Sequence, residues 1–205
     1  MKYKHIIFDI DGTLLDSKYA DLHGLQDTLK ELKNEVIDMK ELTFALGIPS
    51  EVALTQLGIK DVPVATKLWN ANFMKYSHTI KLFDGIRELL PELRQKGYRL
   101  GIVTSKNPQE FANDFVPQQI DHYFDTVLCV TDSPRPKPYG DPIITYLERT
   151  QILPEEAIYI GDTIYDYQCA THAGIDFGLA LWGCMNRENI HARYYLDSPK
   201  DILTI

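Results

Sequence analysis

"HIIFDIDGTLLDS", residues 5–17, is the stretch that decides the fold. Its first part is a short apolar, β-branched run, which is typical of a strand buried on both faces of a parallel sheet. The run ends in two acidic residues one position apart, Asp9 and Asp11, and Gly12 and Thr13 follow at once. Two carboxylates in an apolar segment cost desolvation and repel each other, and a bound cation would relieve both effects. The stretch therefore predicts a buried strand whose end faces a cation.

Strand and helix patterns alternate through most of the chain after this strand. Residues 86–93 place apolar side chains at helical spacing, with Pro91 as an expected kink and Gly97 as the helix end. The other expected strands cover residues 98–105, 125–130, 156–162 and 176–182, and the other expected helices cover 107–115, about 141–150 and about 163–173. This alternation predicts an α/β fold with a doubly wound sheet.

Residues 17–80, which we call the cap segment, break this alternation. They contain helical stretches punctuated at 47–50 and 57–63, and no convincing strand. Four leucines mark one expected helical face: Leu22, Leu25, Leu29 and Leu32. Because the sheet pattern resumes only near residue 98, the sequence predicts an all-helical subdomain inserted into a core of residues 1–16 and 81–205.

The charge balance narrows the classes of partner. The chain carries 21 Lys and Arg against 29 Asp and Glu, a formal net charge of −8. Such an excess of acid disfavours binding to nucleic acid or to an anionic membrane, because both need basic patches. No apolar run approaches the roughly 18 residues that span a bilayer, and the first apolar run is too short and too acidic for a signal peptide. Cys129, Cys169 and Cys184 are widely spaced and form no CxxC motif, so we expect reduced thiols in a cytoplasmic protein.

Polar side chains gather where the expected strands end. Besides Asp9 and Asp11, the set comprises Thr104 and Ser105 after the second strand, Lys137 in the proline-rich loop after the third, and Asp162 and Asp166 after the fourth. Ligands of open α/β sheets bind at the carboxyl ends of the strands, so we expect these side chains to converge. Taken alone, each has a local explanation: a Ser/Thr turn for 104–105, a solvated lysine for 137, a helix N-cap for 162 and a first-turn acid for 166. Their combination in this order favours a functional site.

This set of side chains suits phosphoryl transfer. Acids without a His/Cys cluster favour a hard cation such as Mg²⁺. The cation and Lys137 would neutralise a phosphate monoester, while backbone N–H groups near Gly12 and the Thr104 hydroxyl would bind its oxygens. One Asp could then attack phosphorus to give an acyl phosphate, and the other could give a proton to the leaving alcohol.

Four stretches resemble, in order, the four motifs of the haloacid dehalogenase (HAD) superfamily: "DIDGTLLDS", "GIVTSKN", "PKP" and "GDTIYD". They are most similar to the phosphoglycolate-phosphatase-like branch, which carries a helical cap after the first motif, and the similarity covers nearly the whole chain. The resemblance implies a Rossmann-like core and a cap that opens and closes over the site, with Asp16 and Ser17 at the hinge. By the same resemblance Asp9 is the nucleophile and Asp11 the general acid/base.

The resemblance also implies a phosphate site and a Mg²⁺ site. Thr104, Lys137 and the Ser105 amide would hold the phosphoryl group. The metal would bind Asp9, the backbone carbonyl of Asp11 and Asp162, with Asp166 coordinating directly or through water. The implied function is a Mg²⁺-dependent phosphatase that hydrolyses a small phosphorylated metabolite through an aspartyl phosphate, as a cytoplasmic monomer or homodimer.

Departures from the family pattern bear on the alternatives. Gly140 replaces a second proline that many relatives have, which should alter the loop but leave the lysine in place. Sugar phosphomutases of the superfamily usually have an arginine in the cap loop, and residues 47–54 contain none, which disfavours a phosphomutase. Asp11 with Gly12 and Thr13 disfavours the dehalogenase branch. A pyrophosphatase stays open as an alternative. A non-enzymatic module that binds a phosphorylated ligand is disfavoured, because such a module would have lost Asp9 or Asp11 and both are present.

The cap segment offers few clues to the substrate. Five of its polar residues are candidates to face a ligand, although solvated helix faces explain them more simply: Ser50, Lys67, Asn70, Lys75 and His78. Trp69 is expected to pack in the core of the cap segment rather than to stack on a substrate.

Overall fold

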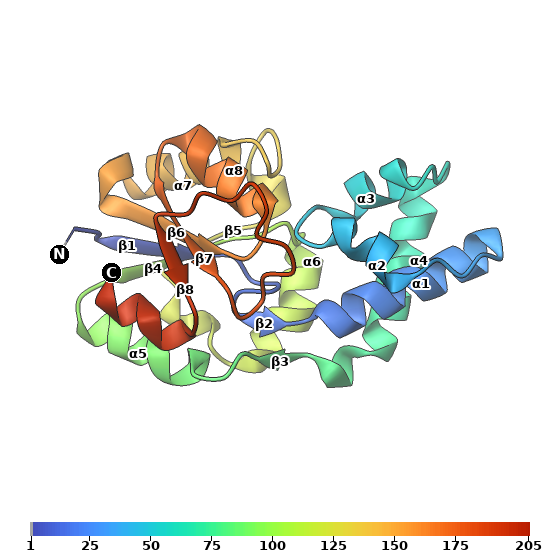
Figure 1. Cartoon of the computed structure of the whole chain (residues 1–205), viewed down its shortest axis with the longest axis horizontal. Helices are drawn as coiled ribbons and strands as arrows, with labels where there is room; N and C mark the ends of the chain where they lie inside the picture. The colour runs from blue at the N-terminus through green and yellow to red at the C-terminus, as the bar shows by residue number, and fades with distance from the viewer. Residues whose placement is uncertain (1) are drawn as a thin grey trace.

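A computed structural model describes residues 2–205. Its centre is a parallel sheet of six strands in the order β5-β4-β1-β6-β7-β8 (Figure 1). The strands are β1 (His5–Phe8), β4 (Arg99–Val103), β5 (Thr126–Leu128), β6 (Ala157–Gly161), β7 (Asp176–Ala180) and β8 (Tyr194–Leu196). The chain leaves β1 toward β4 and β5 and later returns to the other side of β1 with β6, so the strand order reverses at β1. Ligands of such sheets bind at this point, beyond the carboxyl ends of the strands.

Helices cover both faces of the sheet, as the doubly wound, Rossmann-like prediction requires. α5 (Ile86–Gln95) lies on one face, while α7 (Asp141–Thr150) and α8 (Ile164–Ala173) lie on the other (Figure 1). Neighbouring residues of β1 alternate between the two layers: Ile6 and Phe8 pack in the cluster that contains α5, and Ile7 packs in the cluster that contains α7 and α8. Burial on both faces explains why β1 is apolar throughout.

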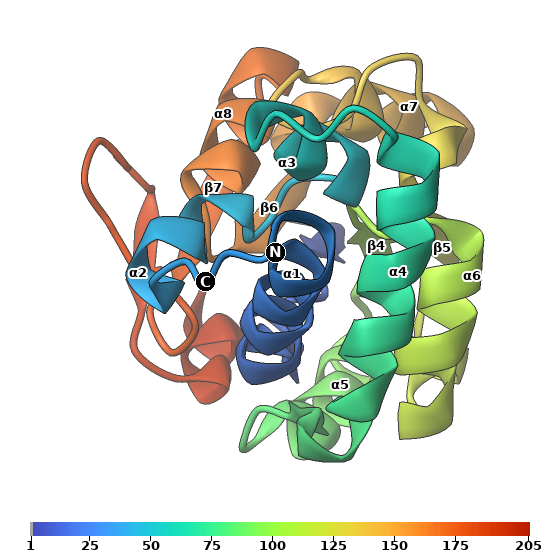
Figure 2. The same ribbon diagram turned by 90° about the vertical axis from the view of Figure 1, so that its right-hand side faces the viewer.

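Two crossings join the cap segment to the core. They are the short strands β2 (Leu15–Asp16) and β3 (Lys81–Leu82), which pair antiparallel. Between them the chain forms α1 (Lys18–Lys33), α2 (Met39–Leu42), α3 (Ser50–Gln56) and α4 (Val62–Lys75), and Figure 2 shows these helices standing in front of the sheet. They enclose an apolar cluster of their own, which includes Leu25, Leu54 and Phe73. The predicted boundaries of the cap segment, residues 17 and 80, stay a prediction, and β2 and β3 lie directly outside them.

One leucine of the cap segment does not follow the predicted stripe. Leu22, Leu25 and Leu29 are buried, but Leu32 is 42% exposed. It lies in the last turn of α1, where Lys30 to Lys33 are all exposed, so this turn extends beyond the apolar cluster. The expectation that Leu32 shares the buried face is wrong for this reason.

Three strands of the structure are too short to show a recognisable strand pattern in the sequence. β2 and β3 have two residues each and β8 has three, and none was predicted from the sequence. The expected helix at 107–115 forms as α6 (Pro108–Glu110) followed by a π-helical turn, Phe111–Phe115.

The three cysteines form no disulfide among the described residues. Within residues 2–205 no helix combines the length and the apolar character needed to cross a membrane.

Candidate active site

The predicted residues meet beyond the carboxyl ends of β1, β4 and β6. Asp9 follows β1 directly, and the loop after it turns sharply at Gly12, whose φ is +77°. A Cβ atom at this glycine would lie 2.1 Å from Oδ2 of Asp162, which follows β6. Only glycine therefore allows the two loops to approach so closely. The N–H of Gly12 donates to the carbonyl of Leu15 and is not free to bind a ligand. Gly12 therefore serves the site by leaving room for Asp162.

Lys137 connects two of the acids. Its side chain is buried, with 3% of its surface exposed, and the local explanation as a solvated loop lysine is wrong. The Nζ atom lies 2.8 Å from Oδ1 of Asp9 and 2.7 Å from Oδ1 of Asp166. The Tyr159 hydroxyl oxygen lies 3.0 Å from the same Asp166 oxygen and 2.8 Å from the carbonyl oxygen of Val103. Because every partner is buried, the lysine is held in one position.

Three carboxylates form a cluster that could hold a cation. Oxygen atoms of Asp9, Asp162 and Asp166 lie within 4.8 Å of one another, and all three residues are buried. Burial, together with the carboxylates of Asp166 and Asp9, raises the pKa of Asp162 well above its usual value. Burial also raises the pKa of Asp9 to about 7, against the opposing effect of Lys137. Lys137 supplies one positive charge for three acids, so full ionisation of the cluster requires a further cation, such as a divalent metal ion.

Of the two local explanations for the acids after β6, the one for Asp166 is right and the one for Asp162 is wrong. Thr163, not Asp162, is the N-cap of α8, so the N-cap explanation for Asp162 is wrong. Asp166 does belong to the first turn, where its Oδ2 accepts from the Thr163 N–H at 3.0 Å and completes a capping box. One carboxylate thus starts the helix with one oxygen and contacts Lys137 with the other.

The side chain of Asp11 turns away from this cluster. Its Oδ1 accepts from the Ser17 hydroxyl at 2.6 Å and lies 3.1 Å from Nζ of Lys106. The carboxylate of Asp11 is therefore not among the grouped metal-ligating oxygens, and the metal contact predicted for this residue concerns its backbone carbonyl only.

Thr104 and Ser105 sit at the end of β4. The Thr104 hydroxyl oxygen accepts from the Lys106 N–H at 3.2 Å, as the local explanation by a Ser/Thr turn predicts, and its proton stays free to donate. The Ser105 hydroxyl donates to the carbonyl of Gly47 in the cap segment at 3.0 Å. Ser105 therefore ties the core to the loop before α3.

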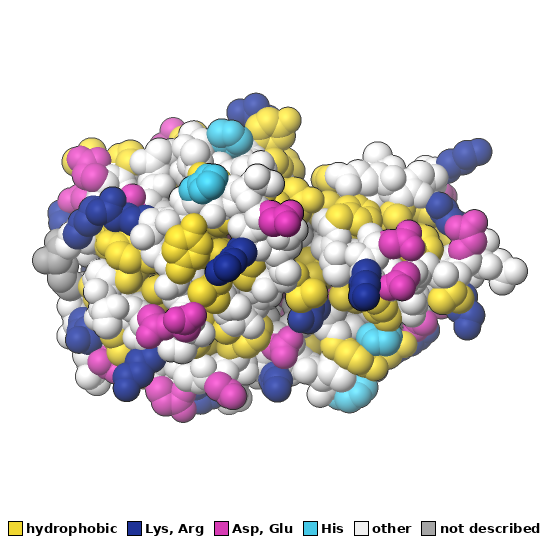
Figure 3. All heavy atoms as spheres, in the orientation of Figure 1, with side chains coloured by type: hydrophobic (Ala, Val, Ile, Leu, Met, Phe, Trp, Pro, Cys, Tyr) yellow, Lys and Arg dark blue, Asp and Glu magenta, His cyan; other side chains and the backbone are white. Residues whose placement is uncertain are grey.

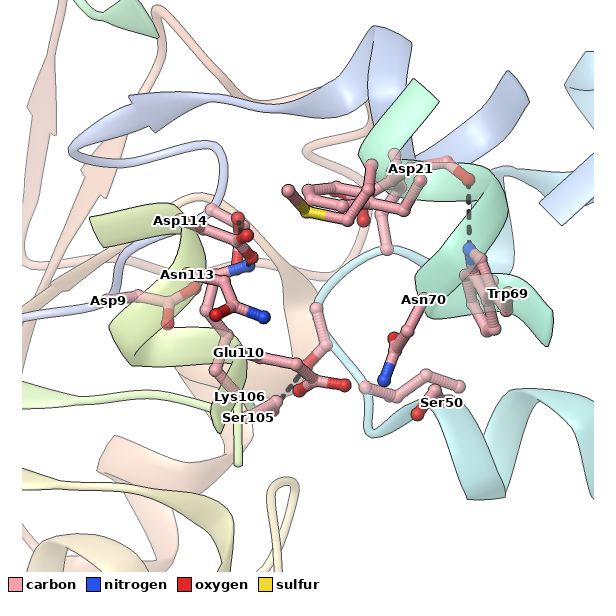
Figure 4. Close-up of a pocket in the computed structure, with 17 residues that line it drawn as sticks. Asp9, Asp21, Ser50, Trp69, Asn70, Ser105, Lys106, Glu110, Asn113 and Asp114 are labelled. Atoms are coloured by element: carbon pink, nitrogen blue, oxygen red, sulfur yellow. Dashed lines mark hydrogen bonds and ion pairs between the residues drawn. The ribbon is translucent and has the colours of Figure 1, made fainter. Parts of the chain in front are cut away.

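A cavity of about 90 Å³ extends from Asp9 and Asp11 into the space between core and cap segment. The space-filling view shows the two parts meeting at a notch, and Figure 4 shows the cavity residues from both sides (Figures 3 and 4). Ser50 and Asn70 line it as expected of candidate ligand contacts. The other three candidates are exposed and lie outside its lining: Lys67, Lys75 and His78. Trp69 packs in the apolar cluster of the cap segment, as predicted, and also lines the cavity.

Lys106 was not predicted as a site residue. It is buried, with 8% of its surface exposed, and its Nζ contacts Asp114 at 2.8 Å as well as Asp11. Burial alone would lower the pKa of this lysine, but the carboxylates of Asp11 and Asp114 raise it well above its usual value. The signal that could have found it is its place two residues after Thr104, directly beyond a strand end.

Asp21 was also missed, because it lies in α1 rather than at a strand end. The Ser17 hydroxyl lies 2.9 Å from Oδ2 of Asp21 and 2.6 Å from Oδ1 of Asp11. One hydroxyl has one proton to donate, so one of these carboxyl groups must itself hold a proton to complete the chain. Burial and the nearby Asp11 raise the pKa of Asp21 to about 8, which assigns that proton to Asp21.

Comparison with known proteins decides the family. The model of the haloacid dehalogenase-like hydrolase family matches residues 6–180. The chain belongs to this family. Curated relatives of the HAD chain include the pyrophosphatase PpaX of Bacillus mycoides, 25% identical over 100% of this chain and 97% of the relative, and that of Bacillus velezensis, 27% identical over 98% and 94%.

Solved structures agree with the fold. A putative phosphoglycolate phosphatase from Lactobacillus plantarum is 29% identical with a TM-score of 0.91, covering 100% of this chain and 99% of that one. A haloacid dehalogenase-like family protein from Streptococcus pneumoniae is 30% identical with a TM-score of 0.86, covering 99% and 98%. The resemblance to the HAD superfamily and the α/β fold with helices on both faces of a parallel sheet are thus confirmed. The protein is a HAD hydrolase of the phosphatase and pyrophosphatase type.

Proposed function

We propose that this HAD hydrolase is a Mg²⁺-dependent phosphatase that hydrolyses a small phosphate monoester through an aspartyl phosphate on Asp9. One observation carries the proposal: Asp9, Lys137 and the acids after β6 meet at one strand end, where a cavity opens toward the cap segment. A carboxylate nucleophile, a fixed cation and a space for a leaving group are the parts that phosphoryl transfer to an enzyme needs.

The residues present fit a bound Mg²⁺. Asp9, Asp162 and Asp166 offer oxygen atoms only, grouped within 4.8 Å, and Mg²⁺ prefers such ligands. Burial, together with neighbouring carboxylates, raises the pKa values of Asp9 and Asp162, so the cluster reaches its full negative charge only when a further cation compensates it. When bound, the ion would neutralise charge on the phosphoryl oxygens and so lower their repulsion of Asp9.

The chain's own residues supply the remaining chemistry. A carboxylate oxygen of Asp9 attacks phosphorus, the bond from phosphorus to the leaving oxygen breaks, and an acyl phosphate forms. Asp11 gives the leaving oxygen a proton and then takes a proton from the water that hydrolyses the acyl phosphate, which restores both acids. Lys137, the free Thr104 proton and the Ser105 amide stabilise charge on the phosphoryl oxygens.

A pyrophosphatase is the second candidate, because the curated relatives named above are pyrophosphatases and match over nearly their full length. The two functions share the same attack and differ in the leaving group, which is an alcohol in one and phosphate in the other. A phosphomutase has less support, because no arginine stands at 47–54.

Phosphate release from a panel of monoesters and pyrophosphate tests the proposal. We expect release with Mg²⁺, none with EDTA, and recovery when Mg²⁺ is restored. Asp9→Asn should lower kcat by at least about a thousandfold. Asp197→Asn, an exposed aspartate outside the cavity, is the matched control and should keep full activity. Substantial turnover by Asp9→Asn, or activity indifferent to EDTA, would refute the mechanism, and a preference for pyrophosphate would favour the second candidate.

A further inference from the structure

The end of the cavity that would receive the leaving group is lined by several acids and one lysine. Asp9 and Asp11 mark the phosphoryl end, and the remaining lining comes from α1, α4, the loop before α3 and the segment 105–114. Figure 4 shows the polar members of this lining, with Asp21, Ser50 and Asn70 of the cap segment facing Glu110, Asn113 and Asp114 of the core. We call this lining the leaving-group end.

The leaving-group end contains one basic residue, and that residue is already neutralised. Lys106 contacts Asp11 at 3.1 Å and Asp114 at 2.8 Å, and its ammonium also lies 5.4 Å from the centre of the Phe73 ring. An anionic group on the ligand would have to displace one of these carboxylates to reach it. Displacing Asp114 would leave a buried carboxylate without a cation, which is strongly unfavourable, and displacing Asp11 would leave a partly buried one.

Acids dominate the rest of the leaving-group end. Asp21, Glu110 and Asp114 all line the cavity, and no arginine or histidine does among the described residues. A second phosphate or a carboxylate on the ligand would add negative charge beside Glu110 and Asp114, and the cavity lining offers no basic group free of a carboxylate partner to compensate it. Hydrogen-bond donors and ammonium groups, by contrast, would find acceptors in the carboxyl groups of Asp21, Glu110 and Asp114.

Size gives a second constraint. The cavity measures about 90 Å³, and its cap wall is formed by Trp69, Phe73 and Ile48. Pockets for drug-sized ligands span roughly 300–1,000 Å³, so the closed cavity admits only a leaving group of a few heavy atoms. Ser50, Asn70 and Asn113 add neutral polar contacts between the acids and the apolar wall.

We propose that the leaving group is a small alcohol that carries hydroxyl or ammonium donors and no anionic group. This inference rests on the proposed phosphatase function and names its substrate class. It separates the chain from the pyrophosphatases and the putative phosphoglycolate phosphatase to which it is similar, because their names imply anionic leaving groups.

A series of two-carbon phosphate esters isolates the charge. Phosphoethanolamine, 2-hydroxyethyl phosphate and phosphoglycolate have leaving groups of nearly equal size that end in an ammonium, a hydroxyl and a carboxylate. We expect kcat/KM for the first two to exceed that for phosphoglycolate by about tenfold or more. Each compound is also measured as a competitor of p-nitrophenyl phosphate, which ranks a compound that is bound but not hydrolysed.

Neutral variants test the named acids. Asp21→Asn and Glu110→Gln keep the side-chain size and remove one carboxyl group each. Burial and Asp11 raise the pKa of Asp21 to about 8, so the ratio is measured at pH 9, and we expect each variant to reduce the preference against phosphoglycolate by about three- to tenfold. The acidity of the leaving alcohols is the same for every protein compared, so a change in the ratio reports the cavity. Glu88→Gln, on the exposed side of α5, is the matched control and should leave the ratio unchanged.

The outcomes separate the two proposals. No hydrolysis of any ester, p-nitrophenyl phosphate included, would refute the phosphatase function itself. Hydrolysis of p-nitrophenyl phosphate with a preference for phosphoglycolate or pyrophosphate would overturn the substrate class and leave the phosphatase function standing. The substrate class would also be wrong if none of the three esters reacted or competed, or if both acid variants kept the wild-type ratio.

Discussion

The two ends of the cavity are built in different ways. At the phosphoryl end, Asp9 follows β1, Asp166 lies in the first turn of α8 and Lys137 lies in the loop between β5 and α7. Each is buried and contacts another member of the set. At the leaving-group end, Asp21 and Asn70 come from separate helices of the cap segment, and their positions depend on how that segment packs on the core. The first end can carry a reaction common to a family, and the second can change its preference by single substitutions. This difference explains how proteins with one fold act on different esters.

Asp11→Asn should lower kcat strongly, and it tests the point in the cavity where the phosphoryl end meets the leaving-group end. The proposed acid/base role predicts that kcat falls about 10²- to 10⁴-fold for an ester of an unactivated alcohol. The loss should be much smaller for p-nitrophenyl phosphate, because p-nitrophenolate leaves without a proton. The measurement is kcat for both esters in both proteins, with Asp197→Asn as control. Equal losses for the two esters would show that Asp11 positions the site rather than protonating the leaving group.

Lys106→Met should lower stability by about 3–5 kcal/mol. The substitution leaves the buried Asp114 and the partly exposed Asp11 without their shared cation, and breaking a buried ion pair on one side has this cost. Each kcal/mol corresponds to a shift in Tm of about 2–4 °C for a chain of this size, so thermal unfolding should show a fall of the order of 10 °C. Lys200→Met, an exposed lysine, is the matched control and should change Tm little. A fall no larger than that of the control would mean that the Lys106 cation does not stabilise this end.

The sequence predicts the phosphoryl end better than the leaving-group end for a physical reason. Asp9, Asp162 and Lys137 could be found because parallel strands bring their carboxyl ends to one edge whatever the details of packing. Lys106 lies at the same edge, but its place beyond a strand end is its one signal, and that place alone does not separate a buried lysine from a solvated one. Asp21 lies inside a helix, and its approach to Asp11 depends on the path through β2 and α1.

The fold shows the same division. The alternating pattern predicts five strands of the sheet and α5, α7 and α8, because apolar periodicity records burial. The pair β2 and β3 could not be predicted, because two residues are too few to show a period. Leu32 shows the opposite case, in which the period continues into a turn that has no neighbour to pack against.

Ser105→Ala tests the contact that joins the two ends. The Ser105 hydroxyl donates to the Gly47 carbonyl at 3.0 Å, and Gly47 lies so close to α8 that a Cβ there would be 2.7 Å from the side chain of Thr163. Loss of one hydrogen bond is worth about 0.5–1.5 kcal/mol, so we expect kcat/KM to fall about three- to tenfold with little change in Tm. Ser77→Ala, which lies outside the cavity lining, is the control. An unchanged kcat/KM would show that this contact does not hold the cap segment over the site.

Asp21→Asn has the smallest expected effect and concerns the proton at the leaving-group end. Burial and Asp11 raise the pKa of Asp21 to about 8, so the folded protein keeps a proton that an unfolded chain releases near pH 4. The stability gained from this proton is complete below about pH 4 and is lost as the pH rises through about 8. The Asn variant has no such dependence. Its Tm relative to wild type, measured in EDTA, should therefore increase by a few °C between pH 5 and pH 8.5.

Asp197→Asn should show no such trend. A difference that does not change with pH would mean that Asp21 is already ionised when the cavity is empty.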